Sequence, residues 1–217
     1  VYGLGGNAYS KNSIEKILKL KQRPKFNPLI VHYYNFDRAV KDVFINDHLI
    51  KLYKKFCPGP ITFILKKKTT SKIHPLATAK LKTVAIRFPD HKVIRSILKK
   101  INFPLAMPSG NKSSNLSPIS AVDVYDEFKK KIPLIIDGGK SKVGIESTVV
   151  DLTNAPKILR PGVIHKNLIE RILKLKIKKN FQYKTIKSPG MMKKHYSPGI
   201  PVSINQIKHD GKSAFIY

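Results

Sequence analysis

Apolar residues recur along this chain with two alternating periods, which predict a succession of helices and strands. Ile14, Ile17 and Leu18 repeat at helical spacing, whereas Leu29-Ile30-Val31 is a short continuous run typical of a buried strand. The same helical spacing predicts further helices at residues 49–56, 93–98, 120–128 and 167–175. Further short apolar runs predict strands at residues 61–65, 83–87, 105–107, 134–136, 148–152 and 157–159. Such alternation is typical of one α/β domain with a mixed sheet.

The periodicity ends near Lys176, and the rest of the chain has a different character. The following stretch is rich in proline and glycine, which is typical of a linker, at Pro189, Gly190, Pro198, Gly199 and Pro201. Two later apolar runs predict the start of a second α/β domain. We expect three parts: an α/β domain over residues 1–176, a linker over 177–201 and a truncated domain over 202–217. Because the chain begins at Val1 and stops inside an apolar run, we expect a fragment truncated at both ends.

The chain is strongly basic, with 42 basic and 13 acidic residues and a formal net charge of +29. Such a charge attracts polyanions such as ATP or tRNA. However, the lysines are scattered, in runs such as Lys66-Lys67-Lys68 and Lys129-Lys130-Lys131, whereas a dedicated nucleic-acid surface usually concentrates its basic residues. We interpret most of the excess as a compositional bias that still helps anionic partners to approach.

Composition also bears on compartment and metal binding. The single cysteine, Cys57, has no partner for an internal disulfide, which fits a reducing compartment, so we expect a cytoplasmic protein. The sequence contains no apolar run of about 18 residues and predicts no membrane contact. The seven histidines have no cysteine or carboxylate at ligand spacing, so the sequence predicts no metal site built from side chains.

The familiar phosphate-binding and nucleophile motifs are absent or incomplete. Gly139-Lys140-Ser141 has the end of a Walker A motif, but Leu134 stands where the motif requires its first glycine. Ser109 lies in a turn that lacks the first glycine of a nucleophile elbow. A protein of this sequence that binds ATP must therefore do so by another route.

Polar residues instead gather where the predicted strands and helices end. Lys21 and Arg23 follow the first helix, where they either compensate the helix dipole or form a cationic clamp for phosphate. His32 ends its apolar run, where it either has a structural role or binds a ligand. The other candidates at such positions are Arg87, the turn Ser109-Gly110-Asn111, Glu146-Ser147-Thr148 and Arg160. Polar groups at strand ends are what a crevice-type ligand site requires.

Eight blocks of sequence carry a resemblance to a known family. They are Val1-Tyr2-Gly3-Leu4-Gly5, Lys21-Gln22-Arg23-Pro24, Asn27-Pro28-Leu29-Ile30-Val31-His32, Pro58-Gly59-Pro60-Ile61-Thr62, Thr83-Val84-Ala85-Ile86-Arg87, Pro108-Ser109-Gly110-Asn111, Glu146-Ser147-Thr148-Val149-Val150-Asp151 and Ile158-Leu159-Arg160-Pro161-Gly162. Taken in order, they resemble the YrdC-like threonylcarbamoyl-AMP synthase family. Ser188-Pro189-Gly190-Met191 and His195-Tyr196-Ser197-Pro198 are similar to the linker of its longer, two-domain members.

The resemblance implies an open twisted mixed sheet with flanking helices and a concave basic groove. It implies a nucleotidyltransferase that forms threonylcarbamoyl-AMP and pyrophosphate from L-threonine, bicarbonate and ATP, with Mg²⁺ accompanying ATP. The product would pass to a separate transferase system that modifies tRNA beside the anticodon. Direct contact with RNA is a further candidate interaction.

The resemblance also implies roles for individual residues. Lys21 and Arg23 would act electrostatically, since no nucleophile is implied. The ATP-binding residues would be Arg23, Asn27, Thr83, Ser109, Asn111, Ser117, Arg160 and either His195 or Tyr196. The threonine-binding residues would be His32, Arg87, the backbone near Met107, and Ser147.

Two features depart from the family pattern. Cys57 stands where the family usually has tryptophan, and the Thr-Glu-Thr segment that precedes the first block is absent from this sequence. The alternative functions are a non-catalytic RNA-binding module with the same fold, a related carbamoyltransferase domain of hydrogenase maturation, and a domain with a dead site. The retained Lys21, Arg23, Ser109 and Asn111 argue against a dead site.

Overall fold

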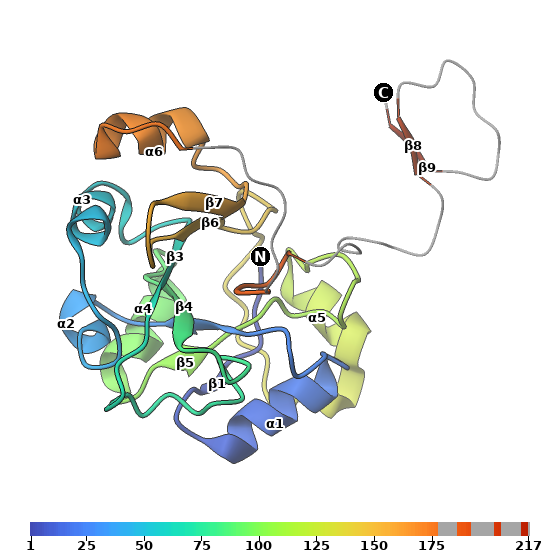
Figure 1. The fold of residues 1–217 in the computed structure, drawn as a ribbon. Helices are drawn as coiled ribbons and strands as arrows, with labels where there is room; N and C mark the ends of the chain where they lie inside the picture. Colours follow the sequence, from blue (N-terminus) through green and yellow to red (C-terminus); the bar gives the residue numbers. More distant parts are fainter. Residues whose placement is uncertain (178–185, 192–201, 205–213, 217) are drawn as a thin grey trace.

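A computed structural model describes residues 1–177, 186–191, 202–204 and 214–216. Its centre is one seven-stranded sheet with the order β1-β5-β2-β4-β3-β6-β7 (Figure 1). The strands are β1 (Gly6–Asn7), β2 (Ile30–His32), β3 (Ile61–Lys66), β4 (Thr83–Arg87), β5 (Leu105–Ala106), β6 (Thr148–Asp151) and β7 (Lys157–Arg160). The pairs β2/β4 and β3/β6 are parallel and the other pairs are antiparallel, so the predicted mixed sheet is confirmed.

Helices flank this sheet. They are α1 (Lys11–Leu20), α2 (Phe36–Ala39), α3 (Asp47–Phe56), α4 (Lys92–Lys100), α5 (Ala121–Phe128), the 3₁₀ turn η1 (Lys129–Lys131) and α6 (Lys166–Leu173). The five longer helices confirm the helical periods of the sequence. None of the helices in the described part of the chain is long and apolar enough to cross a membrane.

The two faces of the sheet are covered differently, because successive strand residues point to opposite sides. Val31, Phe63 and Ile86 belong to the main core, in which side chains of α1, α3 and α6 also lie. Ile30 and Ala85, their neighbours in sequence, belong to a much smaller apolar cluster on the other face. Helices therefore bury one face of the sheet, and the second face is available for a site.

One predicted strand is wrong. Residues 134–136 form no strand, and Leu134 and Ile136 are 70% and 49% exposed. Only Ile135 packs inward, against the small cluster around Leu4 and α5. A continuous apolar run becomes a strand only when a neighbouring strand pairs with it, and this run follows η1 away from the sheet. β1 and α2 are too short to give a periodic signal, and the sequence analysis did not predict them.

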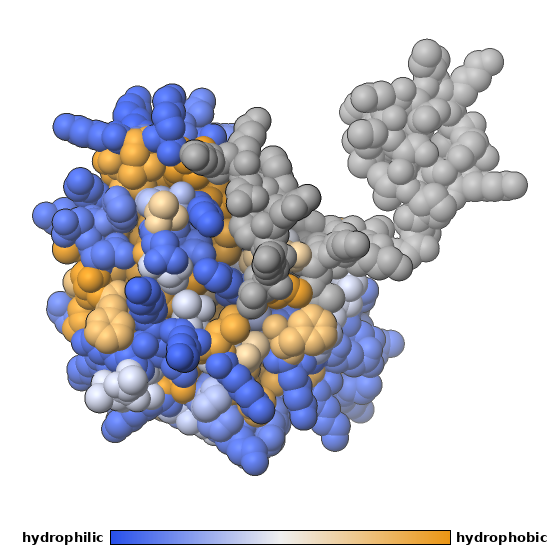
Figure 2. Space-filling view, viewed as in Figure 1, coloured by the Kyte–Doolittle hydropathy of each residue, from blue (hydrophilic) through white to orange (hydrophobic). Residues whose placement is uncertain are grey.

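Beyond the sheet domain, only parts of the predicted linker and second domain lie within the described residues. Strands β8 (Val202–Ile204) and β9 (Ala214–Ile216) pair in parallel in a separate two-stranded sheet, within the two apolar runs from which the sequence predicts the start of a second domain. The division of the chain into residues 1–176, 177–201 and 202–217 stays a prediction. Figure 2 shows hydrophilic residues spread over this face of the molecule rather than gathered in one patch, which fits scattered lysines.

The N-terminus of α5 offers a test of whether a capping side chain stabilises this helix. Ser120 accepts a hydrogen bond from the Asp123 N–H (3.2 Å), and Asp123 accepts one from the Ser120 N–H (3.0 Å), so the two residues form a capping box at the start of the helix predicted over residues 120–128. Ser120→Ala should lower the free energy of unfolding by about 1 kcal/mol, because one orphan N–H loses its partner. Urea unfolding measures this. Ser120→Thr keeps a hydroxyl and should cost much less, and equal losses in both variants would contradict the capping role.

Candidate functional site

The strand register brings distant polar residues to one end of the sheet. His32 ends β2 opposite Arg87 at the end of β4, because these two strands are parallel. Thr62, near the start of β3, pairs with the same Arg87, because β3 runs antiparallel to β4. On the far side of β3, Val149 of β6 pairs with Arg160 at the end of β7. The predicted gathering of strand-end residues is thus present in the fold.

These residues border the less covered face of the sheet. Ile30, Ala85 and Val149 form part of its apolar floor. His32 and Arg87 lie two residues further along the strands of Ile30 and Ala85, hence on the same face, and Ser147 directly precedes β6, two residues before Val149. The site therefore combines an apolar floor with a polar rim.

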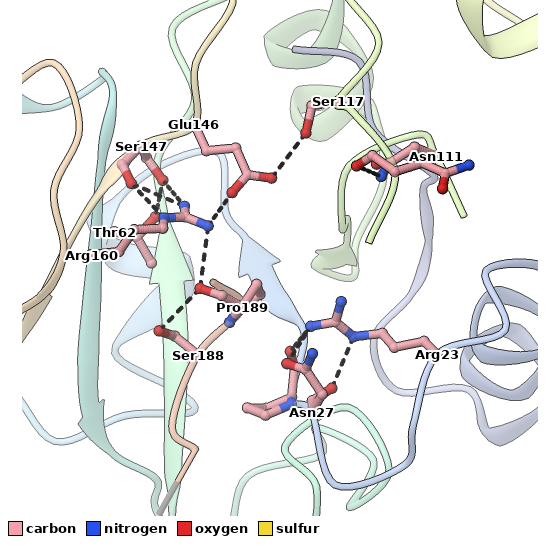
Figure 3. Close-up of polar contacts among 12 residues, drawn as sticks. Arg23, Asn27, Thr62, Asn111, Ser117, Glu146, Ser147, Arg160, Ser188 and Pro189 are labelled. Carbon is pink, nitrogen blue, oxygen red and sulfur yellow. Dashed lines mark hydrogen bonds and ion pairs between the residues drawn. The ribbon is translucent and has the colours of Figure 1, made fainter. Parts of the chain in front are cut away.

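Arg160 is the centre of the polar rim (Figure 3). Its Nε and Nη2 donate to the Ser147 carbonyl oxygen at 3.1 and 2.9 Å, and Nη2 also lies 3.2 Å from Ser147 Oγ. Its Nη1 forms an ion pair with Glu146. Thr62 Oγ1 lies 2.7 Å from Ser147 Oγ, and Ser117 Oγ donates to Glu146 at 3.2 Å. One hydrogen-bonded network thus runs from β3 to the loop that contains Ser117.

Arg23 faces this network from the other side. Its Nε donates to the Asn27 carbonyl (2.9 Å), and its Nη2 donates to Asn27 Oδ1 (2.6 Å) and to the Pro28 carbonyl (2.9 Å). These bonds fix the guanidinium to the loop that enters β2. Burial lowers the pKa of Arg23 to about 10, with Arg160 contributing further. The guanidinium stays charged at neutral pH, within the electrostatic reach of Arg160 and Glu146.

Lys21 supports the turn at Ser109–Asn111. Its buried ammonium donates to the Ser109 carbonyl at 2.6 Å and to the Asn111 carbonyl. The Asn111 side chain in turn donates to the carbonyls of Lys112 (2.8 Å) and Asn115 (2.7 Å). Burial, and then Arg23, lowers the pKa of Lys21 to about 7. In this geometry Lys21 holds a turn, and the two sequence interpretations, a dipole partner and a phosphate clamp, stay predictions.

Arg87 and His32 form a second polar pair. Arg87 Nε donates to the Gly59 carbonyl at 3.2 Å, and burial lowers its pKa to about 10, followed by repulsion from Arg160. His32 is buried with Nδ1 3.1 Å from the Ile30 carbonyl oxygen. Burial and the neighbouring Arg87 lower the pKa of His32 to about 3. At neutral pH a neutral imidazole therefore lies beside a cationic guanidinium.

Part of the predicted linker crosses the site. The Pro189 carbonyl accepts a hydrogen bond from Arg160 Nη1 (3.3 Å), and Lys187 Nζ pairs with Asp151 at 2.8 Å. Gly190 has a φ of +87°, and a Cβ there would lie 2.6 Å from Arg160 Cδ, so the close approach requires glycine. Met191 packs on the apolar floor. His195 and Tyr196 lie outside the described residues.

A groove of about 780 Å³ opens beside the network. Asn111 and Ser117 line it together with apolar Leu116 and Ile145 and the carboxylates of Asp123 and Glu127. Its volume is in the range of small-molecule sites. Within the described residues, no group of three histidine, cysteine or acidic side chains could hold a metal ion.

Two expected site residues lie less centrally. Thr83 is at the opposite end of β4 from Arg87, about 13 Å along the strand at the usual rise. Met107 reaches β2 through its backbone, with its N–H donating to the Ile30 carbonyl (2.9 Å). Conversely, Glu146 and Thr62 belong to the network although the sequence analysis gives neither a ligand-binding role, and names only Glu146 among the polar candidates at strand ends. For Thr62, its presence in a matched block was the only signal in the sequence.

The sequence profile of the Sua5/YciO/YrdC family, described as "Telomere recombination", matches residues 1–162. The chain belongs to this family. A second profile, "Threonylcarbamoyl-AMP synthase, C-terminal domain", matches residues 164–214. The resemblance expected from the sequence blocks is confirmed.

Curated relatives in this family include two threonylcarbamoyl-AMP synthases. That of Pyrococcus abyssi is 39% identical and that of Bacillus subtilis 38%, each over 94% of this chain. The alignments cover 61% and 60% of those proteins, so the chain spans about three-fifths of their length. The crystal structure of P. abyssi Sua5 complexed with L-threonine is 38% identical, with a TM-score of 0.88 over 94% of this chain and 61% of that one. The predicted YrdC-like fold is confirmed.

The clamp on the Ser109–Asn111 turn can be tested by substitution. In Lys21→Met the two carbonyls lose their donor while a linear side chain of similar length remains. The amide hydrogens of residues 109–115 should then exchange at least tenfold faster, because the turn opens more often. Hydrogen exchange read by mass spectrometry or NMR measures this. Lys25→Met, at an exposed position, is the control, and unchanged exchange in Lys21→Met would rule out the clamp.

The neutral His32 makes stability depend on pH. The pKa of His32 is about 6.5 in the unfolded chain, whereas burial lowers it to about 3 in the folded chain. Because the unfolded chain takes up the proton first, the free energy of unfolding falls as pH drops from 6.5 towards 3. Between pH 6.5 and 5 the chain should lose about 2 kcal/mol more than His32→Gln, which does not titrate. Denaturant unfolding at each pH gives the free energy of unfolding of the wild type and of His32→Gln. Parallel pH profiles for the two proteins would contradict the buried neutral state.

Proposed function

We propose that this chain carries the active site of an L-threonylcarbamoyladenylate synthase. The observation that supports it most is the joint position of two polar groups at one sheet end. Arg87, His32 and Ser147 suit a small amino acid, and Arg23 and Arg160 beside them suit a polyphosphate. The names of the relatives support the same activity, although this chain spans only about three-fifths of their length.

L-Threonine would bind over the apolar floor. The Arg87 guanidinium would pair with its carboxylate, which guanidinium geometry favours. Neutral His32 would offer a hydrogen bond without adding a positive charge beside the reacting amine. Ser147, fixed by Thr62 and Arg160, and the backbone near Met107 would complete the amino-acid subsite.

ATP would lie along the groove and the cations. Arg23 and Arg160 would contact its phosphates, while the other nucleotide contacts would come from Asn27, Thr83, Ser109, Asn111, Ser117 and either His195 or Tyr196. Lys21 would act through the turn that it holds. Because several buried cations raise one another's energy, an anionic ligand relieves their repulsion. The site thus favours a polyphosphate over a neutral nucleoside.

The reaction then needs orientation rather than a protein nucleophile. The threonine amine attacks the carbon of CO₂ derived from bicarbonate, loses a proton and becomes a carbamate. A carbamate oxygen attacks the α-phosphorus of ATP, the bond to the β-phosphate oxygen breaks, and pyrophosphate leaves. Arg23 and Arg160 stabilise the negative charge that develops, and the apolar floor limits water.

Mg²⁺ would accompany ATP and lower the charge of the phosphates. It prefers oxygen ligands and usually keeps several waters. Glu146 is the carboxylate within the network and is already paired with Arg160, so the phosphates would supply most ligands. The product would go to a tRNA-modifying transferase system, and the basic surface would aid any direct contact with RNA.

The test uses the protein expressed at its full length. Incubation with ATP, Mg²⁺ and bicarbonate should release pyrophosphate with threonine, more slowly with serine and not with valine, and should yield the adenylate mass. Arg87→Lys should raise the KM for threonine at least tenfold with little change in the KM for ATP, because the bidentate fork is lost.

Arg95→Lys is the matched control. Arg95 stacks on the Tyr34 ring, 4.7 Å from its centroid, outside the site, so both KM values should stay at the wild-type level. Absence of turnover in the wild-type protein together with measurable tRNA binding would overturn the synthase proposal and favour an RNA-binding module.

A further inference from the structure

Glu146 is a buried carboxylate in the network that the proposed reaction does not use. It lies directly before Ser147 at the entry to β6, and its side chain is only 11% exposed. One carboxylate oxygen pairs with Arg160 Nη1, and the other accepts a hydrogen bond from Ser117 Oγ at 3.2 Å (Figure 3). A carboxylate so close to an expected polyphosphate site requires an explanation, because it repels the ligand.

Glu146 connects the side chains of two segments of the site, the end of β7 and the loop before α5. Arg160 ends β7, whereas Ser117 belongs to the loop before α5 that lines the groove. Both side chains are expected to contact the same nucleotide. Because each is bonded to a different oxygen of one carboxylate, their separation is set by Glu146.

The bonding of Arg160 identifies what a phosphate must replace. Nε and Nη2 are engaged by the Ser147 carbonyl, which belongs to the backbone of the sheet domain. Nη1 is shared by Glu146 and by the Pro189 carbonyl at 3.3 Å. Glu146 therefore supplies the negative charge at the one corner of the guanidinium that is not held by the sheet.

We propose that Glu146 is a positioning residue of the nucleotide site, which holds Arg160 and Ser117 in place and competes with the incoming phosphates for Arg160. The proposal rests on the proposed function. It explains why a buried carboxylate is retained among cations: the geometry is preset, at the cost of some affinity. The field of Glu146 also acts on Lys21, Arg23 and Arg87 and favours their charged forms, so it serves as counter-charge for the whole group.

A positioning carboxylate and a merely structural one predict different kinetics. Glu146→Gln keeps the size but removes the charge, so the dissociation constant for ATP should fall roughly three- to tenfold as one repulsion disappears. The kcat should fall about tenfold or more, because the bridge that sets Arg160 Nη1 and Ser117 relative to each other is weakened. Glu146→Asp keeps the charge but is too short to bridge both partners, so it should lower kcat at nearly unchanged affinity.

The experiment measures ATP binding by calorimetry without threonine and turnover by pyrophosphate release, on the full-length protein. Glu15→Gln is the matched control: it removes the same charge from an exposed pair with Lys11 (3.9 Å) far along the chain, and both constants should stay at the wild-type level. Opposite changes in affinity and kcat for Glu146→Gln, with a melting temperature near that of the wild type, support the proposal.

Three outcomes would overturn it. Wild-type constants in Glu146→Gln would show that the carboxylate has no role, and parallel losses of binding, turnover and melting temperature would show a structural role. A wild-type protein that binds no ATP would remove both this proposal and the proposed function. If the wild type binds ATP but releases no pyrophosphate, the proposed function fails alone, and tighter ATP binding by Glu146→Gln still supports a carboxylate that competes for Arg160.

Discussion

The burial of several positive charges at one end of a sheet is the constraint on which this structure depends. Lys21, Arg23 and Arg87 all have lowered pKa values, chiefly because they are removed from water. Such charges are tolerated only where fixed dipoles or counter-charges surround them. Here the carbonyls of Ser109, Asn27 and Gly59 supply the dipoles, and Glu146 supplies the counter-charge. The loops at this edge of the sheet therefore place carbonyls and a carboxylate around the buried cations.

The sheet allows this arrangement because one of its faces packs the core and the other faces the site. One face, packed against α1, α3 and α6, holds the large core and fixes the strands. The other has only a small apolar floor, on which the segment of residues 186–191 lies. A rigid support on one side allows strained or charged groups on the other. The mixed pairing matters equally, since antiparallel β3 and β4 place Thr62 beside Arg87.

Residues 186–191, part of the predicted linker, lie against the site. Its carbonyl at Pro189 reaches Arg160, and Gly190 passes against the same side chain with no room for a Cβ. Ser188 is fully buried and Lys187 is tied to Asp151. A phosphate that engages Arg160 must therefore share it with, or displace, this segment and Glu146. Under the proposed function, a nucleotide bound at Arg160 would be coupled to the position of residues 186–191 through this guanidinium.

Much of this could be predicted from the sequence, because the signals are local. Periodicity identified the five longer helices and most strands, and the ends of the apolar runs placed Arg87, His32 and Arg160 at strand ends. The ordered blocks identified the family. Tertiary structure decided what depends on partners distant in sequence. It left residues 134–136 without a partner strand, showed that Lys21 supports a turn, and gave Glu146 its contacts with Arg160 and Ser117. The reason is that a strand needs a neighbour and a buried charge needs a counterpart, and neither is visible in a local pattern.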